Sequence, residues 1–322
     1  MPARKTVSED DLVDLHGKVV LVTGGNSGIG YATIQMLARN GAKVYMAARD
    51  EGRAAAAIKQ LQDENINDGS VHWLKLDLSD PRDARRAANE VLEKEQRLDI
   101  LGTFIMQLAI APKLIVHNGF LELMVVNHIS HFVLTDTLLP LMKSTAQEPG
   151  ADVRIVNVTS NAHTRVKPET FSTKEAFNKD YGNSTSQFLD TYGNSKLANI
   201  LHVKALQKRL DAEGVPITCL APHPGAIKTP GSDRFLASIP RAGWFLKLLG
   251  PLVFAPPRKG AMTVAFAAAG KEVLAQRAKY QGAYLVPIAT IASPSSFALD
   301  ERLQKELYES TEGFVKEMAT IT

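Results

Sequence analysis

Short apolar runs alternate along the chain with segments whose apolar positions recur at helical spacing. KVVLVTG, residues 18–24, is an apolar run that ends in glycines, and IGYATIQMLARNGA, residues 29–42, has the spacing of an amphipathic helix. The predicted elements after these are a strand in 42–50, an alanine-rich helix through Gln62, a strand in 71–77, a helix at 81–96, an apolar segment at 98–110, a helix at 119–143, a strand in 153–160, a helix around 191–196, a strand in 215–225, a strand in 280–287 and a helix at 294–314. Because each crossover returns the chain in the same direction, the alternation predicts an α/β fold: a doubly wound parallel sheet flanked by helices, in a single domain over residues 1–322.

Residues 229–257 interrupt this alternation with prolines and bulky apolar groups, which predicts a cap over a substrate pocket. The window GWFLKLLGPLVFA, residues 243–255, is the most apolar of the chain, but it contains Lys247, Gly250 and Pro251. A helix that spans a bilayer needs about 20 apolar residues, so no transmembrane segment is predicted. The apolar cap favours a lipophilic small-molecule substrate, although a dimer surface or a membrane-surface contact would have the same character.

Composition narrows the class of protein and its compartment. Hydrophobic residues make up 45% of the chain and charged residues 22%, the balance of a globular protein. The net charge of +3 arises from 37 basic and 34 acidic residues without a long basic run, so no nucleic-acid partner is expected. The single cysteine, Cys219, cannot form an internal disulfide, and the N-terminus lacks the apolar core of a signal peptide. These features predict a reducing, cytoplasmic location.

The segment TGGNSGIG, residues 23–30, lies between the first predicted strand and the first predicted helix. At such a position the backbone N–H groups and the helix dipole together favour a phosphate group. A purely structural turn would also use glycines, but the position after the first strand favours a dinucleotide site. The candidate phosphate-binding residues are Gly24, Asn26, Ser27, Gly28, Ile29 and Gly30.

The end of the second predicted strand indicates which dinucleotide is bound. NAD sites usually place an acidic residue there, which holds the ribose 2′-hydroxyl. This chain has Ala48 followed by Arg49 at that position, and an arginine can pair with a 2′-phosphate. NADP(H) is therefore the predicted cofactor, with a solvated surface arginine as the alternative interpretation. Asp77, after the third strand, would suit the adenine edge, or it could be an ordinary capping acid.

The segment TYGNSK, residues 191–196, places Tyr192 and Lys196 one helical turn apart and hence on one helix face. A nearby ammonium group stabilises a phenolate, so the lysine would lower the pKa of the tyrosine. A free tyrosine has a pKa of ~10, so ionisation at neutral pH requires that pKa to fall by about 3, which corresponds to roughly 4 kcal/mol. The alternative is a packed phenol beside a solvated amine.

Four motifs in order resemble the short-chain dehydrogenase/reductase family: TGGNSGIG, VNHISHF around Asn127, VNVTS ending at Ser160, and YGNSKLANI from Tyr192. APHPGAIKT and the late YLVP are similar to its retinol-dehydrogenase-like branch. The resemblance covers nearly the whole chain and implies a Rossmann-type oxidoreductase that reduces a ketone or aldehyde, or oxidises the alcohol. It also suggests an oligomer, either a homodimer or a tetramer.

By this resemblance, Tyr192 gives or takes the proton at the substrate oxygen, and Ser160 forms a hydrogen bond to the same oxygen. Lys196 would hold the nicotinamide ribose and lower the pKa of the tyrosine, and Asn127 would anchor a water that relays protons to the lysine. Three further residues match the stretch that seats the nicotinamide: Pro224, Gly225 and Thr229. His128 and His131 lie three apart, but no third ligand is near in sequence, so no metal is predicted.

The sequence departs from the family pattern after the fourth predicted strand. Where the family usually reads Asn-Asn-Ala-Gly, this chain reads GTFIMQLAIAP at residues 102–112. An ungapped alignment puts Thr103 to Met106 at the four positions, and a shifted one puts Met106 to Ala109 there. A methionine in place of the glycine would crowd the cofactor. A redox-neutral enzyme, such as a cyclase, dehydratase or isomerase, therefore remains an alternative, and a non-catalytic binding protein is a third.

Overall fold

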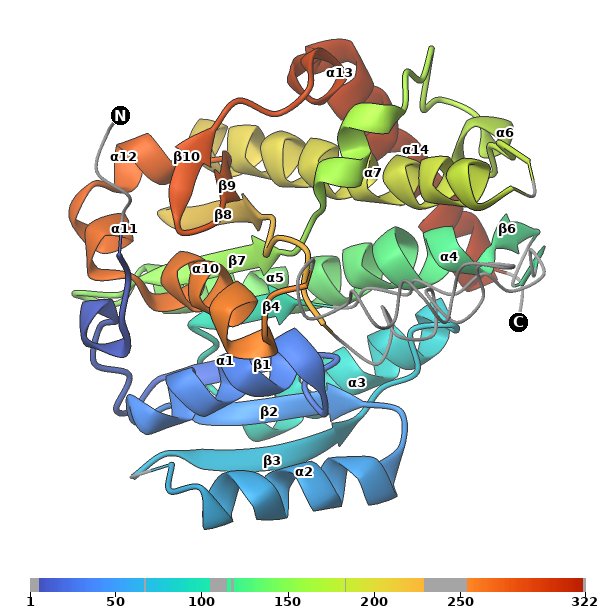
Figure 1. The fold of residues 1–322 in the computed structure, drawn as a ribbon. Helices are drawn as coiled ribbons and strands as arrows, with labels where there is room; N and C mark the ends of the chain where they lie inside the picture. Colours follow the sequence, from blue (N-terminus) through green and yellow to red (C-terminus); the bar gives the residue numbers. More distant parts are fainter. Residues whose placement is uncertain are drawn as a thin grey trace.

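A computed structural model describes residues 6–66, 68–104, 115–116, 119–182, 184–228 and 254–320. Its centre is an eight-stranded sheet in the order β10-β9-β8-β7-β4-β1-β2-β3, in which only the β9–β10 pair is antiparallel (Figure 1). The strands are β1 Val19–Thr23, β2 Lys43–Ala48, β3 Ser70–Lys75, β4 Ile100–Thr103, β7 Val153–Asn157, β8 Ile217–Pro222, β9 Ala283–Val286 and β10 Thr290–Ala292, and a separate pair joins β5 Ile115–Val116 to β6 Phe120–Leu121. The predicted doubly wound parallel sheet is thus confirmed.

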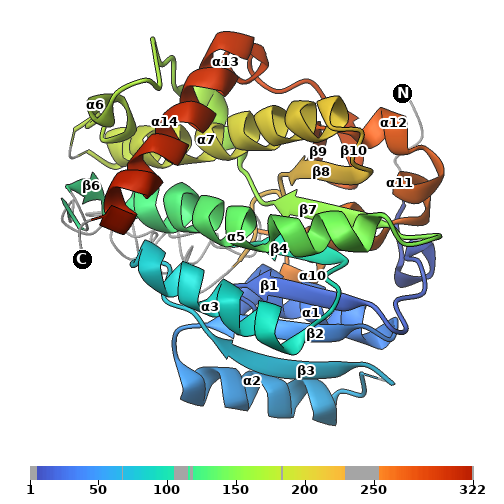
Figure 2. The ribbon, with the colours of Figure 1, turned by 180° about the vertical axis from the view of Figure 1, so that it is seen from behind.

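Helices cover both faces of the sheet (Figures 1 and 2). One layer holds α1 Gly28–Arg39, α2 Glu51–Asp63 and α10 Pro257–Ala269, and the other holds α3 Pro81–Lys94, α5 Ser130–Ala146 and α7 Thr185–Ala212. Every residue of β1, β7 and β8 is buried, which explains their largely apolar sequence, because a strand covered on both faces has no solvent side. Within the described ranges, no helix is both long and apolar enough to cross a bilayer.

The helix predicted at 119–143 begins later and is not uniform. Phe120–Leu121 is strand β6, and α4 Glu122–Met124 leads into a π-helical turn, Val125–Ile129, before α5 starts. The apolar side chains of this stretch pack into the core. The predicted homodimer stays a prediction.

The C-terminal third differs most from the sequence-based expectation. The predicted cap lies mainly at residues 229–253, outside the described residues; at its end Ala255 pairs with Ile227, and α10 begins at Pro257. The expected last helix is two helices, α13 Ser296–Leu299 and α14 Glu301–Thr320, because Asp300 ends the first and its carboxylate accepts the Arg302 N–H at the start of the second. The remaining short helices are α6 Lys174–Phe177, α11 Lys271–Ala275, α12 Arg277–Tyr280 and the 3₁₀ turns Glu9–Asp11 and Asn161–Arg165.

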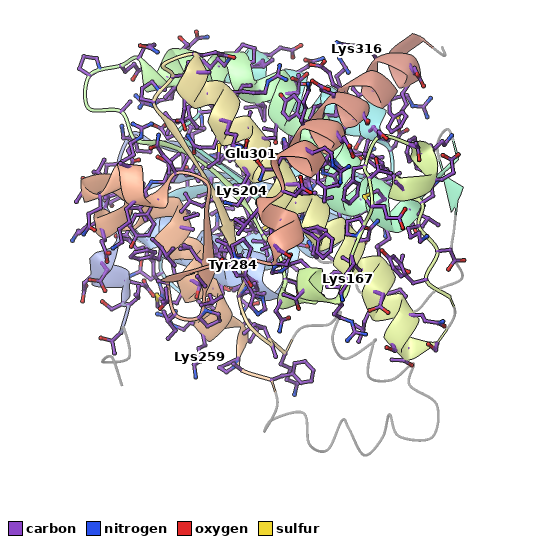
Figure 3. All side chains as sticks on the ribbon, turned by 90° about the horizontal axis from the view of Figure 1, so that it is seen from above. Lys167, Lys204, Lys259, Tyr284, Glu301 and Lys316 are labelled. Atoms are coloured by element: carbon purple, nitrogen blue, oxygen red, sulfur yellow. The ribbon has the colours of Figure 1, made fainter. Side chains whose placement is uncertain are left out.

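Helix α14 lies across α7 on the outer side of its layer (Figures 2 and 3). The Tyr308 ring packs edge-on against Phe132 of α5 at 5.2 Å, and the guanidinium of Arg209 on α7 lies 4.2 Å from the centre of the same ring. At the start of α14, Glu301 pairs with Lys208 at 2.7 Å. The C-terminal helix thus binds α5 and α7 together from outside.

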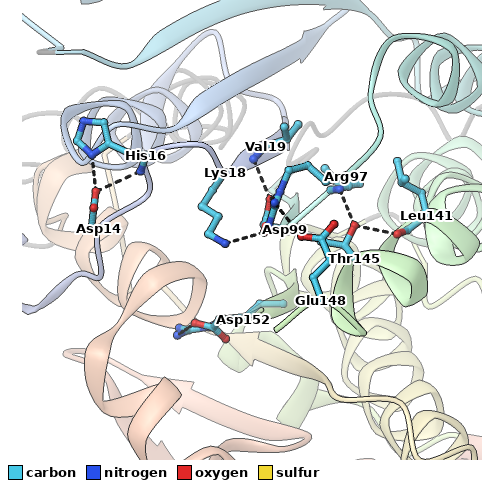
Figure 4. Close-up of polar contacts among 12 residues, drawn as sticks. Asp14, His16, Lys18, Val19, Arg97, Asp99, Leu141, Thr145, Glu148 and Asp152 are labelled. Atoms are coloured by element: carbon cyan, nitrogen blue, oxygen red, sulfur yellow. Dashed lines mark hydrogen bonds and ion pairs between the residues drawn. The ribbon is translucent and has the colours of Figure 1, made fainter. Parts of the chain in front are cut away.

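A buried carboxylate anchors the amino-terminal end of the sheet (Figure 4). Asp99 is 1% exposed; it accepts the Val19 N–H at 2.9 Å and two hydrogen bonds from Arg97 at 2.9 and 2.7 Å. The Lys18 ammonium lies 3.6 Å from the same carboxylate, and Glu148 pairs with Arg97 at 2.9 Å. This group ties β1, β4 and the end of α5 together.

We expect Asp99→Ala to lower the free energy of unfolding by about 3 to 5 kcal/mol, since it leaves cationic groups and a buried N–H without their partner. The matched control is Asp50→Ala, which removes a half-exposed capping carboxylate from α2 and should cost only about 1 kcal/mol. Urea unfolding followed by circular dichroism measures both. Equal losses in the two variants would contradict a structural role for Asp99.

Candidate active site

The site lies where the sheet changes its direction of winding. From β1 the chain proceeds outward through β2 and β3, and from β4 it proceeds the other way through β7 and β8. Strands β1 and β4 are neighbours, with Leu21 opposite Leu101. Ligands of such sheets bind beyond the carboxyl ends of the strands at this switch point. The glycine turn follows β1 there, and Ser160 follows β7.

The glycine turn has the geometry of a phosphate-binding loop. Gly24 and Gly28 adopt φ angles of 62° and 58°, which favour glycine. A Cβ at Gly30 would lie 2.3 Å from the carbonyl oxygen of Gly24, so only glycine lets α1 start this close to the turn. Ser27 is exposed, and in the described chain its hydroxyl accepts no hydrogen bond from the first turn of α1. Together with the half-buried Asn26 and the buried Ile29, this arrangement fits a dinucleotide phosphate.

Arg49 and Asp77 lie together at the carboxyl ends of β2 and β3. The Arg49 side chain is 73% exposed, and its guanidinium is 3.9 Å from the Asp77 carboxylate. Asp77 also accepts hydrogen bonds from the N–H and hydroxyl of Ser79, at 3.0 and 2.8 Å. The cap of α3 is Asp80 rather than Asp77, so capping is not the role of Asp77. The exposed guanidinium is free to turn toward a phosphate.

Tyr192 and Lys196 lie one turn apart on α7, which starts at a capping box formed by Ser184 and Gln187. They are 3% and 1% exposed, and the Lys196 ammonium lies 5.7 Å from the centre of the tyrosine ring. The ammonium donates to the Val158 carbonyl at 3.2 Å. The two side chains therefore share one face of the helix, as the sequence predicts.

Burial is the main influence on the pKa values of Tyr192 and Lys196. It raises the pKa of Tyr192, and the Ser160 hydroxyl acts in the opposite direction. Burial also lowers the pKa of Lys196 from 10.5 to about 7. Burial thus disfavours the charged form of each group, and the effect of Lys196 on the pKa of Tyr192 stays a prediction for the site with its cofactor bound.

Ser160 occupies the turn after β7 and faces the tyrosine. Its hydroxyl accepts the Ala162 N–H at 3.2 Å, capping the 3₁₀ turn Asn161–Arg165. Although it influences the pKa of Tyr192, no described residue forms a hydrogen bond of ordinary geometry with the tyrosine hydroxyl. The buried Tyr192 hydroxyl thus lies beside the Ser160 hydroxyl and retains the capacity to donate a hydrogen bond to a substrate oxygen.

Asn127 lies in the π-helical turn and is fully buried. Its side chain forms a hydrogen bond to α7. Its side-chain nitrogen donates to the Ser195 hydroxyl at 3.0 Å, which in turn donates to the Tyr192 carbonyl at 2.8 Å. π-Turns within helices occur frequently at functional sites. The tetrad of Asn127, Ser160, Tyr192 and Lys196 is thus brought together, whereas the proposed relay water stays a prediction.

The stretch predicted to seat the nicotinamide, residues 224–229, lies within the described residues as far as residue 228. Gly225 has a φ of 92°, and a Cβ at Gly260 would lie 3.1 Å from the Pro224 carbonyl oxygen, so α10 packs tightly below this loop. Thr229 lies outside the described residues. At the end of β4, Thr103 and Phe104 are buried. The rest of the altered motif, from Ile105 onward, lies outside the described residues, as Thr229 does.

Sequence reasoning missed several residues that support the site. Gly193 lets α7 approach the Ser160 turn, because a Cβ there would lie 2.4 Å from the Ala162 carbonyl oxygen. His163 donates from Nδ1 to the Ser160 carbonyl at 2.7 Å and accepts the Ser295 N–H at 3.1 Å, which fixes the turn. The glycine beside the tyrosine is the one local signal that could have indicated this close packing.

Two other hollows of the described chain lie away from the tetrad. A hollow of about 540 Å³ lies over α3, and one of about 580 Å³ lies beside the N-terminal segment; neither contains a residue of the tetrad. Across the described ranges, no group of three His, Cys, Asp or Glu side chains could hold a metal ion. His128 and His131 have separate partners, Thr311 and Thr23.

The family described as short chain dehydrogenase matches residues 18–172 of the chain. The chain is 41% identical over 309 residues to a short-chain dehydrogenase/reductase of Armillaria gallica, with 96% of each chain covered. It is 32% identical over 321 residues to retinol dehydrogenase 14 of Mus musculus, covering 94% of this chain and 86% of that protein. The chain therefore belongs to the short-chain dehydrogenase/reductase family, and its homology to that retinol dehydrogenase is distant.

Solved structures agree with this assignment. An uncharacterized protein of Mycobacterium paratuberculosis has a TM-score of 0.71 at 27% identity, covering 97% of this chain and 98% of that one. The active-site complex of Pseudomonas aeruginosa RhlG with NADP has a TM-score of 0.62 at 25% identity, covering 86% and 96% of the two chains. The chain is thus a Rossmann-type oxidoreductase of a family that uses NAD(P)(H).

The pKa of Lys196 makes stability depend on pH. In the unfolded chain the pKa of this lysine is 10.5, whereas in the fold it is about 7. Between these values the unfolded state binds more protons, so the free energy of unfolding rises with pH. Relative to Lys196→Met, the nucleotide-free wild type should gain on the order of 4 kcal/mol across this interval.

Urea unfolding at a series of pH values measures this difference, and Lys59→Met, at an exposed position of α2, is the matched control. Parallel curves for the wild type and Lys196→Met would show that the lysine is not held neutral by burial.

Proposed function

We propose that this protein is an NADP(H)-dependent oxidoreductase that reduces a ketone or aldehyde on a lipophilic small molecule, or oxidises the corresponding alcohol. The observation that carries the proposal is the convergence of Ser160, Tyr192 and Lys196 at the carboxyl ends of the strands. A binding protein would not need a buried phenol and a buried amine on one helix face, since each costs solvation energy.

The residues of the chain fit this chemistry. When bound, the nicotinamide supplies or accepts the hydride. The Tyr192 hydroxyl gives a proton to the substrate oxygen during reduction and removes it during oxidation, and Ser160 donates a hydrogen bond to that oxygen. Lys196, with a pKa of about 7, is poised to exchange a proton at neutral pH and to hold the ribose.

Two observations support NADP(H) rather than NAD(H). Arg49 follows β2 where an NAD site usually has an acid, and its side chain is largely exposed at that edge. The related Pseudomonas aeruginosa RhlG was solved with NADP. A guanidinium can form paired, charge-assisted hydrogen bonds to a 2′-phosphate, which a 2′-hydroxyl cannot match.

The preference for a lipophilic substrate rests on residues 229–257. Their sequence is rich in bulky apolar groups, and Ile227, just before them, forms a parallel bridge with Ala255 near their end. The relative from Mus musculus is named for retinol, a lipophilic alcohol. An apolar cover over the crevice would exclude water from the reacting oxygen.

Tyr192→Phe removes the proton donor with little change of shape. We expect turnover of a lipophilic aldehyde or of phenanthrenequinone to fall about a hundredfold to ten-thousandfold, while NADPH affinity measured by calorimetry stays unchanged. Tyr308→Phe, on α14 and outside the site, is the control. Full activity in Tyr192→Phe would exclude the proposed proton transfer.

Arg49→Ala tests the cofactor preference. Loss of the charge-assisted contact should weaken NADPH binding about tenfold to a hundredfold, with NADH binding unchanged. Arg53→Ala, on the exposed face of α2, is the matched control. Equal effects on NADPH and NADH would show that Arg49 does not contact a 2′-phosphate.

The altered sequence at residues 102–112 favours one other function, a redox-neutral reaction that keeps Tyr192 as an acid. Substrate turnover without a change in NADPH absorbance, lost in Tyr192→Phe, would support that function. A stoichiometric requirement for NADPH would exclude it.

A further inference from the structure

A line of buried polar groups joins the end of β1 to the catalytic helix. Thr23 Oγ1 lies 3.0 Å from His131 Nε2, and His131 Nδ1 lies 3.2 Å from the Asn127 carbonyl oxygen. Asn127 then reaches Ser195 at 3.0 Å, and Ser195 reaches the Tyr192 carbonyl at 2.8 Å. The side chains of Thr23, His131, Asn127 and Ser195 are at most 1% exposed. The line thus runs from the start of the glycine turn to the tyrosine entirely within the core.

The partners fix the protonation of the imidazole. A carbonyl oxygen can only accept, so the Nδ1 of His131 carries the proton and donates to Asn127. Burial lowers the pKa of His131 to about 3, so the ring is neutral and Nε2 accepts the Thr23 hydroxyl proton. The Thr23 oxygen is in turn held by the Phe104 N–H at 3.0 Å. The ring therefore has one tautomer and one orientation.

The backbone that His131 contacts is an unusual one. In the π-helical turn, the Ser130 N–H donates to the Val125 carbonyl, five residues back instead of four. Asn127 lies in the middle of this widened turn, and His131 lies one turn later, at the beginning of α5. Its ring reaches back along the helix and holds the carbonyl of the same residue whose side chain reaches toward α7.

We propose that His131 is a positioning residue for the active site: its Nδ1–H holds the Asn127 backbone in the π-helical turn and thereby places Tyr192 and Lys196. The proposal rests on the oxidoreductase function proposed above. An apolar residue would fill the same volume without the desolvation of an imidazole, so packing does not account for this side chain. The Thr23 hydroxyl contributes by selecting the tautomer that can donate to Asn127.

Two substitutions separate the two hydrogen bonds of the ring. His131→Asn keeps a side-chain N–H near the position of Nδ1, and so keeps the bond to the Asn127 carbonyl. His131→Gln keeps a polar group near the position of Nε2, and so keeps the bond to Thr23. Both variants place an amide of similar polarity in the core, so each is the control for the loss of stability in the other.

With NADPH and phenanthrenequinone, we expect His131→Gln to lower kcat about tenfold, with the KM for NADPH unchanged, and His131→Asn to retain nearly the wild-type kcat. Melting temperatures should fall by similar amounts. A purely structural role would instead make kcat follow the melting temperature in both variants, and this result, or wild-type kcat in His131→Gln, would overturn the proposal.

A second measurement does not depend on activity. Nitrogen-15 NMR of labelled histidine in the full chain should show His131 as the neutral Nδ1–H tautomer, with that proton protected from exchange. The Nε2–H tautomer would overturn the proposal directly. If the wild type oxidises no NADPH with any carbonyl, the oxidoreductase function fails, while the tautomer still reports on the hydrogen bond to Asn127.

Discussion

The close packing of α7 against the end of β7 is the constraint on which the rest of the site depends. Gly193 lets the helix approach the turn that carries Ser160, because any larger residue would strike the Ala162 carbonyl. The same approach brings the Lys196 ammonium to the Val158 carbonyl and the Thr159 hydroxyl to the Lys196 carbonyl, at 3.2 and 2.7 Å. Since a protein interior has almost no free volume, this contact fixes the distance between the serine and the tyrosine. The reactive hydroxyls therefore meet because of backbone packing, with little freedom left to their side chains.

Much of the fold follows from the sequence, because strands buried on both faces are largely apolar runs that alternate with segments of helical spacing. The tyrosine and lysine could be paired by their helical spacing alone, whereas Ser160 and Asn127 entered through the family resemblance. The contacts from Asn127 to Ser195 and from Thr23 to His131 join residues 68 and 108 positions apart. Such contacts depend on how whole helices pack, and no local pattern carries that information. The π-helical turn also has no marker in its sequence, VVNHI, and it interrupts a helix predicted as continuous.

The protonation of the site depends on burial as well as on the neighbouring charge. An ammonium near a phenol stabilises the phenolate, and this favours a lowered pKa for Tyr192. In the folded chain the loss of solvation is larger, so the pKa of the tyrosine rises and that of the lysine falls to about 7. At neutral pH the tyrosine is therefore neutral and the lysine is close to half protonation, which suits a pair that exchanges protons.

Strand β10 has a consequence for how two copies of the chain could meet. It pairs antiparallel with β9, with Ile291 opposite Leu285, and so occupies the edge at which β9 would otherwise present unpaired N–H and C=O groups. On the adjacent face, α14 lies over α5 and α7. The sheet therefore ends on this side in a three-residue strand, too short to be an effective template for further β-pairing. Any association that extends the sheet across this border would have to displace β10 from β9 first.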